Sequence, residues 1–412
     1  MRTLDGEMPV VVTGMGVIAP NGIGSEAFWN GLLHPTPGKI ETTYQVGPIA
    51  DELLPEDFRN PKVRRRLDNF SVFALAAAFE ATNQAGISGD VAPNRLAVVI
   101  STGDGGEETR EADIVNVKGD GDPRFKLMSP FHVPASMPNA AAAHVSRYLG
   151  AGGPSECGVE ACASGALGII KGLRILQLNQ ADAVVVGASE ATAQAPYALA
   201  GFRRATALSN EGISRPFDEQ RDGFIPGEGA GVFVIETLER AQARGATPLA
   251  EIVGYGSTSD HGDITQPDPE GDGLTRAILE SLAMGTLRPE DVGHINAHGT
   301  STKLNDEVEA LVFSKLFPHN PYVTSIKGST GHGLGAAGAI ETAATIMALR
   351  QGLISPTNNY HNRDPNMPYI NLVTGQPARW DHDGHGVAIN VNAAFGGHNS
   401  ALVLRALINS AA

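Results

Sequence analysis

Residues 156–170 read Glu156-Cys-Gly-Val-Glu-Ala-Cys-Ala-Ser-Gly-Ala-Leu-Gly-Ile-Ile170, an apolar run that begins at a cysteine among small residues. The small residues allow close backbone approach, and the leucines and isoleucines continue a buried helical pattern as far as Leu176. The pattern predicts that Cys162 lies at or near a helix N-terminus, where unpaired N–H groups and the helix dipole favour a thiolate. A lone cysteine in an apolar helix is more often inert, so the rest of the chain has to decide its role.

The composition is that of a soluble globular protein. The 412 residues are 42% hydrophobic and 18% charged, enough to bury a large core. We expect a cytoplasmic protein, because the sequence has neither a signal-peptide pattern nor an apolar run of membrane-spanning length. Cys157 and Cys162 are the two cysteines, and they predict neither a disulfide framework nor a zinc site.

The net charge of −15 argues against binding to nucleic acid or to anionic membranes, because both need a basic surface. One dense basic cluster does occur, formed by Lys62, Arg64, Arg65 and Arg66. Such a cluster is usually a solvated helix start. It is also the place where an acidic partner would bind.

The chain alternates apolar strand patterns with helical patterns, which predicts a layered α/β fold with helices on both faces of buried sheets. Residues 249–256 repeat the pattern of residues 9–16, an apolar strand closed by Gly-x-Gly, and the order of elements then starts again. We therefore expect two similar halves, residues 1–250 and 251–412. Two local predictions are a helix at residues 25–33 capped by Ser25 and one long helix over residues 63–85.

Three motifs are weak signals for other functions. Gly14 to Ala19 and Gly333 to Gly338 both fit a dinucleotide-binding fingerprint, but the first runs into Pro20-Asn-Gly and the second is explained by close helix packing. His294 and His298 are four residues apart, yet they lie in a strand-like segment and lack the Glu of a zinc-protease motif. We expect neither a nucleotide cofactor nor a metal.

Two histidine motifs from the second half change the interpretation of Cys162. They are Asn296-Ala-His298-Gly-Thr-Ser-Thr302 and Lys327-Gly-Ser-Thr-Gly-His332. Each histidine follows a strand pattern among small and hydroxyl residues, which is typical of a residue that lines a cleft. A cysteine with two histidines suits nucleophilic acyl transfer: the thiolate carries the acyl group, and the imidazoles exchange protons or donate hydrogen bonds to oxyanions.

These motifs, together with Glu160-Ala-Cys-Ala-Ser-Gly165, Asn392-Ala-Ala-Phe-Gly-Gly397 and the segment from Arg215 to Gly231, resemble those of the β-ketoacyl-acyl-carrier-protein synthases. The resemblance covers nearly the whole chain and includes synthase II enzymes and the catalytic subunits of type II polyketide systems. It implies a thiolase-like fold, with two pseudo-symmetric halves in a layered αβαβα arrangement.

The resemblance also implies a catalytic mechanism. Cys162 would accept an acyl chain from a carrier protein's phosphopantetheine, with the N–H groups of Cys162 and Phe395 as the oxyanion hole. His298 and His332 would stabilise the enolate that malonyl-carrier protein forms when it loses CO₂. No metal or organic cofactor is implied. The supporting roles are a buried pair at Lys327 and Glu341, pantetheine contacts at Thr300 and Thr302, and a gate at Phe395.

Some positions depart from the synthase II pattern. Ala394 and His398 flank the gate where relatives usually carry Gly and Thr. Asp104, His132 and Phe202 are candidate residues of the acyl pocket, and Asp104 would be a costly neighbour for a long saturated chain. These departures favour a polyketide, possibly polyene, ketosynthase whose partner is a chain-length factor. A housekeeping fatty-acid synthase II homodimer is the alternative.

Other classes are less favoured. A non-catalytic partner or scaffold subunit would lack the nucleophile, whereas this sequence keeps Cys162 and both histidines. A thiolase would carry a second catalytic cysteine late in the chain, and the sequence has none after Cys162. An acidic acyl carrier protein is the expected partner of the basic side chains, which are Lys62, Arg64, Arg65 and Arg66 together with Arg203 and Arg204.

Overall fold

The computed structural model describes residues 8–36, 41–118 and 123–407. The strands of these residues form one 12-stranded sheet and a separate two-stranded ribbon. The large sheet has two halves, which meet where β1 pairs with β7 in antiparallel register, Val10 opposite Ile252. In order across the sheet, the first half is β4 (Ser155–Glu156), β3 (Leu96–Ser101), β5 (Ala183–Glu190), β6 (Gly229–Thr237) and β1 (Val10–Ala19).

The second half repeats the first in strand order and direction. From β1 outward it contains β7 (Ala250–Ser259), β14 (His398–Arg405), β13 (Val387–Ala394), β8 (His294–Asn296), β9 (Tyr322–Thr324) and β11 (Asn371–Leu372). The inner three strands of each half are antiparallel neighbours, β1, β6 and β5 in one and β7, β14 and β13 in the other. The next strands, β3 and β8, run parallel to β5 and β13. The predicted internal repeat is therefore confirmed.

The Gly-x-Gly pairs that suggested the repeat each allow a helix to pack closely on a strand, one pair in each half. A Cβ at Gly16 would lie 2.0 Å from the carbonyl oxygen of Ala77, and one at Gly256 would lie 1.9 Å from that of Ala277. Only glycine lets α4 (Asn69–Ala85) and α11 (Asp272–Met284) pack this closely on their strands. Close helix packing thus accounts for the first of the two fingerprints that resemble a dinucleotide-binding motif.

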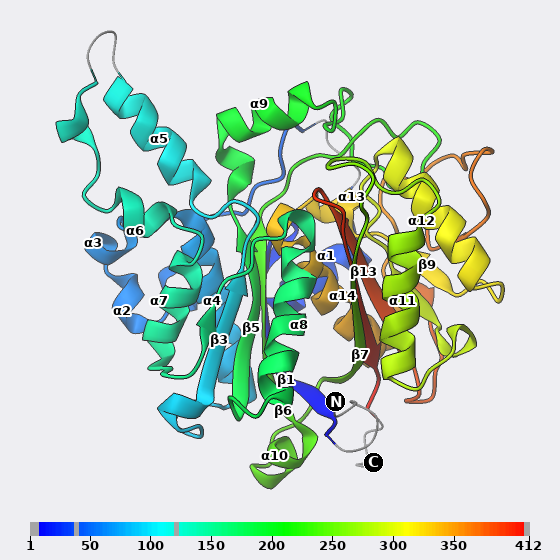
Figure 1. Cartoon of the computed structure of the whole chain (residues 1–412), viewed down its shortest axis with the longest axis horizontal. Coiled ribbons are helices and arrows are strands. Elements are labelled where there is room, and N and C mark those ends of the chain that lie inside the picture. Colours follow the sequence, from blue (N-terminus) through cyan, green and yellow to red (C-terminus); the bar gives the residue numbers. More distant parts are fainter. Residues whose placement is uncertain (1–7, 37–40, 119–122, 408–412) are drawn as a thin grey trace.

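The layers follow from which face each helix covers (Figure 1). The outer face of the first half is covered by α4 and α7 (Ala140–Leu149), and that of the second half by α11 and α12 (Lys303–Leu316). Between the halves, α8 (Ser164–Gln177) and α14 (Ala337–Gln351) pack against each other and against both halves of the sheet. This is the predicted αβαβα arrangement.

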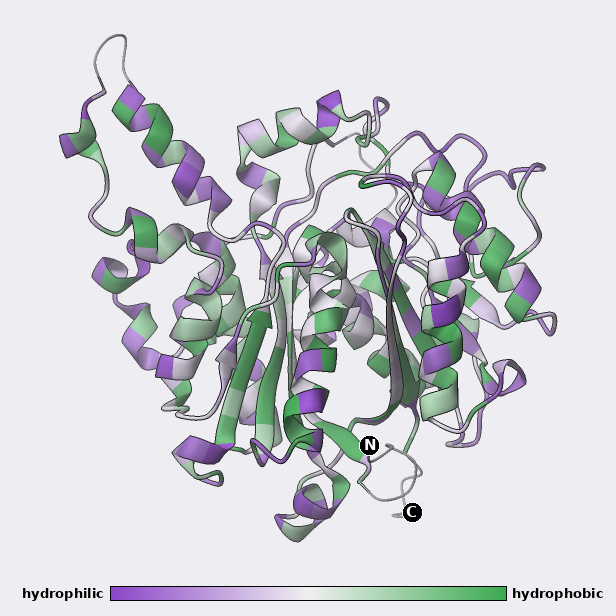
Figure 2. Cartoon of the chain, in the orientation of Figure 1, coloured by the Kyte–Doolittle hydropathy of each residue, from purple (hydrophilic) through white to green (hydrophobic). Residues whose placement is uncertain are grey.

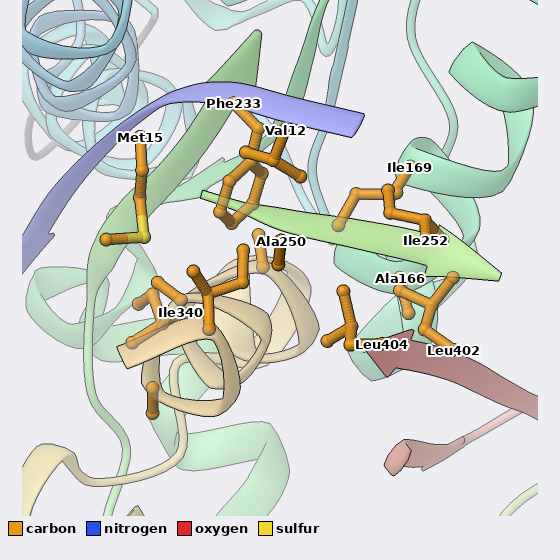
Figure 3. Packing of buried hydrophobic residues seen from close by; sticks show 14 of the residues in the cluster. Val12, Met15, Ala166, Ile169, Phe233, Ala250, Ile252, Ile340, Leu402 and Leu404 are labelled. Atoms are coloured by element: carbon orange, nitrogen blue, oxygen red, sulfur yellow. The ribbon is translucent and has the colours of Figure 1, made fainter. Parts of the chain in front are cut away.

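The three largest clusters of the core follow the same layers. Neighbouring residues of one strand enter different clusters, as Val232 and Phe233 of β6 do, so the sheet is buried on both faces. Figure 2 shows the resulting hydrophobic strands. The central cluster joins the two halves, and Figure 3 shows Val12 and Ile252 from the sheet packed with Ile169 of α8 and Ile340 of α14.

One local prediction was wrong, and a second was wrong only in its cap. The expected helix over residues 63–85 is divided into α3 (Pro61–Arg64) and α4, because the Asp68 carboxylate accepts the Phe70 N–H at 3.1 Å and caps α4. The helix at residues 25–33 is present as α1 (Ser25–Leu33), but Gly24 precedes it and the Ser25 hydroxyl donates to the Met15 carbonyl instead of capping.

The remaining elements are short or lie at the periphery. They are α2 (Glu56–Arg59), α5 (Glu107–Lys118), α6 (His132–Ser136), α9 (Pro196–Arg204), α10 (Leu238–Ala243), α13 (Lys327–Thr330), β2 (Gly22–Ile23), β10 (Leu353–Ile354) and β12 (Ala378–Arg379). Among the described residues, no helix is both long and apolar enough to cross a membrane.

Candidate active site

Cys162 lies in the 3₁₀ turn Ala161–Ala163, immediately before α8. Ala161 has a φ of 47°, a left-handed conformation that makes a sharp turn into the helix. Close packing brings the N-termini of α8 and α14 together here, since a Cβ at Gly165 would lie 2.5 Å from the Ala339 nitrogen. The predicted position of the cysteine at a helix N-terminus is confirmed. Close packing also explains two glycines of the second fingerprint, since a Cβ at Gly338 would lie 2.8 Å from the Ala166 nitrogen of α8 and one at Gly335 would lie 2.0 Å from the Gly103 nitrogen.

His298 follows β8, in a turn held by a buried carboxylate. Glu309 on α12 accepts the N–H of His298 at 2.7 Å and that of Gly299 at 2.6 Å. Burial is the main reason that the pKa of Glu309 is raised to about 8. Glu309 on α12 thus fixes the turn that carries His298.

The donors around His298 determine its tautomer. The Lys327 ammonium lies 3.2 Å from the Nδ1 of His298, and the Asn392 side-chain nitrogen lies 3.4 Å from it. An ammonium can only donate, so Nδ1 has to be the acceptor and the proton is on Nε2.

His332 has the same tautomer as His298, but a different donor determines it. The Leu334 N–H donates to its Nδ1 at 3.3 Å, which again leaves the proton on Nε2. Burial lowers the pKa of both His298 and His332 well below the usual value, and Lys327 lowers them further. Both rings are therefore neutral, and each has one N–H left to donate. Their centroids are 5.1 Å apart at an interplanar angle of 82°.

Lys327 and Glu341 form an ion pair whose side chains are 1% and 2% exposed. Lys327 also donates to the carbonyl of His298, and Asn392 donates to the second oxygen of Glu341 at 2.5 Å. Burial raises the pKa of Glu341, while the Lys327 ammonium opposes the shift. The pair is fully hydrogen-bonded, which is the condition under which a buried ion pair is tolerated.

The three residues face one cavity of about 650 Å³. Phe202 and Phe395 lie on its wall with ring centroids 6.5 Å apart, and Phe224 lies 5.7 Å from Phe202. Thr300 and Thr302 also line the cavity, with their hydroxyl oxygens 2.9 Å apart. Among the described residues, the backbone N–H groups of Cys162 and Phe395 find no acceptor within the protein. A nucleophile, free N–H donors and an apolar wall thus share one space.

The family is decided by the comparison with known sequences. The model of the β-ketoacyl synthase N-terminal domain matches residues 7–241, and that of the C-terminal domain matches residues 249–361. This chain belongs to the β-ketoacyl synthase family. It is a ketosynthase, an acyltransferase, as the ordered motifs predicted.

Individual relatives support the same family. A Synechocystis protein named 3-oxoacyl-[acyl-carrier-protein] synthase 2 is 38% identical, and the alignment covers 96% of this chain and 97% of the relative. The structure of the ishigamide ketosynthase/chain length factor is similar with a TM-score of 0.87 at 29% identity, over 97% and 100% of the two chains. A type II polyketide ketosynthase complexed with its acyl-carrier protein has a TM-score of 0.84 at 28% identity, over 97% and 99%.

The resting state of the nucleophile differs from the expectation. Burial raises the pKa of the Cys162 thiol of this ketosynthase to about 12, although Lys327 lowers it. The helix N-terminus alone therefore does not make Cys162 a thiolate at neutral pH. Ionisation of the thiol therefore needs further stabilisation of the sulfur anion.

One of the three predicted acyl-pocket residues lines the cavity that holds Cys162. Phe202 lines the cavity of the ketosynthase, but Asp104 and His132 do not. Asp104 is directed towards Thr192, 3.5 Å away. Burial and the nearby charge of Asp104 raise the pKa of Glu190 to about 8. His132 pairs with Asp113 at 2.9 Å. The charge of Asp104 nevertheless raises the pKa of Cys162, so the acyl-pocket role of Asp104 and His132 stays a prediction.

The predicted carrier-docking residues form two groups. Lys62, Arg65 and Arg66 are exposed in and after α3, while Arg64 pairs with Asp51 at 3.1 Å. Arg203 and Arg204 are exposed at the end of α9, which Figure 1 shows on a separate part of the ketosynthase surface. Only the α9 group adjoins the cavity, since Phe202 lies beside it in sequence.

Sequence reasoning gave no role to Glu309, Asn392 or Arg221. Fully buried Arg221 donates to the carbonyls of Thr302 at 3.3 Å and Lys303 at 3.2 Å and so holds the edge of the cavity. Asn392 and Arg221 did lie in quoted motifs, but only the folded contacts reveal what each one does. Among the described residues, no group of three or more His, Cys, Asp or Glu side chains is arranged to hold a metal ion.

Proposed function

We propose that this ketosynthase condenses a Cys162-bound acyl group with malonyl-acyl carrier protein, with loss of CO₂, to give 3-oxoacyl-acyl carrier protein. The observation that carries the proposal is the pair of neutral imidazoles, each with its Nε2–H free, beside a thiol in one cavity. Two N–H donors suit a reaction in which negative charge develops on a thioester oxygen. They suit proton abstraction less well, because the basic Nδ1 of each ring already accepts a hydrogen bond from the protein.

The first half-reaction loads the enzyme. The Sγ of Cys162 attacks the carbonyl carbon of the acyl thioester, and the free N–H groups of Cys162 and Phe395 stabilise the oxyanion that forms. Collapse of this intermediate breaks the bond to the pantetheine sulfur, which leaves as a thiol with the proton of Cys162. The acyl group is then held as a thioester on Cys162.

The second half-reaction forms the carbon–carbon bond. The malonyl thioester oxygen accepts hydrogen bonds from His298 and His332, and loss of CO₂ leaves an enolate at this oxygen. The enolate carbon attacks the Cys162 thioester, and the departing thiolate takes up one proton to restore the thiol. We propose that the reaction needs neither a metal nor an organic cofactor, because loss of CO₂ supplies the driving force.

Thr300 and Thr302 are proposed to bind the pantetheine arm. They line the cavity with hydroxyl groups that accept and donate hydrogen bonds, as an amide-bearing arm requires. The two basic groups, one after α3 and one at the end of α9, are proposed to dock the acidic carrier protein. A neighbour in the structural comparison is a ketosynthase in complex with its carrier protein, which supports this partner.

We further propose a type II polyketide pathway and a partner subunit of the chain-length-factor type. The ishigamide ketosynthase/chain length factor is a structural neighbour. Exposed apolar side chains offer a face to such a subunit, among them Val159 (52% exposed), which follows the edge strand β4, and Val133 of α6 (68% exposed). A fatty-acid synthase II homodimer is the second candidate, and the 38% identical relative favours it. We place either enzyme in the cytoplasm, where both cysteines would remain free thiols.

Reconstitution tests the reaction and the pathway together. The purified chain, with and without a co-encoded ketosynthase-like subunit, is supplied with acyl- and malonyl-carrier protein, and the carrier-bound products are weighed by intact-mass spectrometry. We expect 3-oxoacyl products that require the partner and disappear with Cys162→Ala. Saturated chains elongated by the purified chain alone would favour the fatty-acid alternative. Wild-type enzyme that forms no product with any primer would contradict the condensation itself.

A further inference from the structure

One wall of the cavity is carried by a helix that lies on the surface. Every residue of α9 is exposed or half-buried, and Figure 1 shows the helix at the periphery of the molecule. Its residue Phe202 nevertheless lines the cavity and packs against Phe224 and Phe395. The position of α9 therefore sets the position of this wall.

The start of α9 has no cap from its own sequence. The preceding residue is Ala195, whose side chain has no acceptor, and Pro196 occupies the first helical position. The next two N–H groups, those of Tyr197 and Ala198, have no acceptor within the helix, as at every helix N-terminus. A surface helix of nine residues with unpaired N–H groups at its start would be only weakly fixed.

Glu111, from the separate helix α5, supplies both acceptors. One carboxylate oxygen accepts the Tyr197 N–H at 2.8 Å and the other accepts the Ala198 N–H at 2.8 Å. Glu111 is 5% exposed, so water competes little for these bonds. The negative charge also lies at the positive end of the α9 dipole. One side chain thus fixes the helix that carries Phe202.

We propose that Glu111 is a positioning residue that sets the length of acyl chain the cavity accepts, by holding α9 and with it the Phe202 wall. The proposal rests on the condensing activity proposed above and adds a determinant of product length. Glu111 touches neither the nucleophile nor the histidines. Its loss therefore affects the size of the cavity more than the chemical steps.

The test compares two isosteric variants of α5. Glu111→Gln keeps the side-chain volume but replaces one acceptor oxygen with an NH₂ group that faces an N–H, and it removes the charge. Glu108→Gln is the matched control on the same helix, because Glu108 accepts from Asn69 of α4 rather than from α9. Both are measured in the full chain, with its partner subunit if activity requires one.

Two readouts are made on each variant. Hydrogen–deuterium exchange at residues 196–204 should be about tenfold faster in Glu111→Gln, as expected for the loss of a charge-assisted hydrogen bond, and unchanged in Glu108→Gln. Carrier-bound products of Glu111→Gln should include chains longer by one or more two-carbon units, with acyl loading of Cys162 at the wild-type rate. A merely stabilising role would lower the unfolding temperature without changing product length.

The outcomes separate this proposal from the one on which it rests. Unchanged exchange in α9, or faster exchange with an unchanged distribution of product lengths, would overturn the role of Glu111. If wild-type enzyme makes no condensation product, the proposed function fails, and the exchange measurement still reports whether Glu111 holds α9.

Discussion

Replacing Lys327 with Met should slow the decarboxylation half-reaction, because it destabilises the His298 tautomer that carries its proton on Nε2. The ammonium lies 3.2 Å from the Nδ1 of His298 and also binds the carbonyl of that residue. Methionine fills a similar volume without a donor. Asn392 then remains as the weaker donor to Nδ1, at 3.4 Å. Part of the population would carry the proton on Nδ1 and present no N–H to the enolate.

The size of the effect follows from the bond that is lost. A hydrogen bond to a charged group contributes about 1.5–3 kcal/mol, and about 1.4 kcal/mol corresponds to a factor of ten. We therefore expect decarboxylation to be slower by roughly 10- to 150-fold. Glu341 loses its cation, but burial already raises its pKa, so it can remain in the core as a neutral acid.

The assay follows the loss of CO₂ from malonyl-carrier protein by mass spectrometry. Both proteins carry Cys162→Ala, because Lys327 also lowers the pKa of Cys162 and would otherwise affect acyl loading. Lys171→Met is the matched control, since Lys171 pairs with Glu160 and makes no contact with His298. A Lys327→Met protein that folds and decarboxylates at the control rate would refute this account of the tautomer.

Three further predictions concern stability and binding. Buried His294 has its pKa lowered to about 3, so the unfolded state binds one proton more between that value and about 6.5. The stability that neutral His294 contributes is fully present above this pH window and is lost as the pH falls through it. In urea titrations, His294→Leu should reduce the slope of the unfolding free energy against pH by about 1.4 kcal/mol per pH unit. An unchanged slope would contradict this. Thr300→Val with Thr302→Val should raise the KM for carrier thioesters about tenfold in steady-state assays, with a smaller effect on kcat, and an unaltered KM would remove the pantetheine role. Arg203→Glu should raise the carrier KM and weaken its salt dependence, whereas unchanged kinetics would exclude docking at α9.

Local patterns predicted the fold because they recur in both halves. The strands that begin the halves share Gly-x-Gly, and each pair of glycines meets a helix backbone at close to 2 Å from the position a Cβ would take. Cys162 and the two histidines were found because each follows a strand or turn among small residues. The family resemblance implied that these three residues share one site, but no local pattern predicted it. In the structure they meet because α8 and α14 pack together.

Other features depend on contacts between distant residues. The sequence could not predict that Glu309 holds the turn at His298 or that Asn392 bridges His298 to Glu341, since these pairs are defined only by the fold. The sequence also could not show that the Asp104 carboxylate faces the Thr192 hydroxyl, 3.5 Å away, because their contact is defined only by the fold. The prediction of one long helix over residues 63–85 failed at Asp68, because its side chain caps a new helix there in spite of the helical pattern.

The central claim is that Cys162 holds an acyl group that condensation then releases. The direct measurement is the mass of the Cys162 peptide after acyl-carrier protein is added, and again after malonyl-carrier protein is added. We predict that the peptide gains the mass of one acyl group and then loses it, as a product longer by two carbons forms on the carrier. An acyl group that never appears on Cys162, while condensation proceeds, would contradict the account.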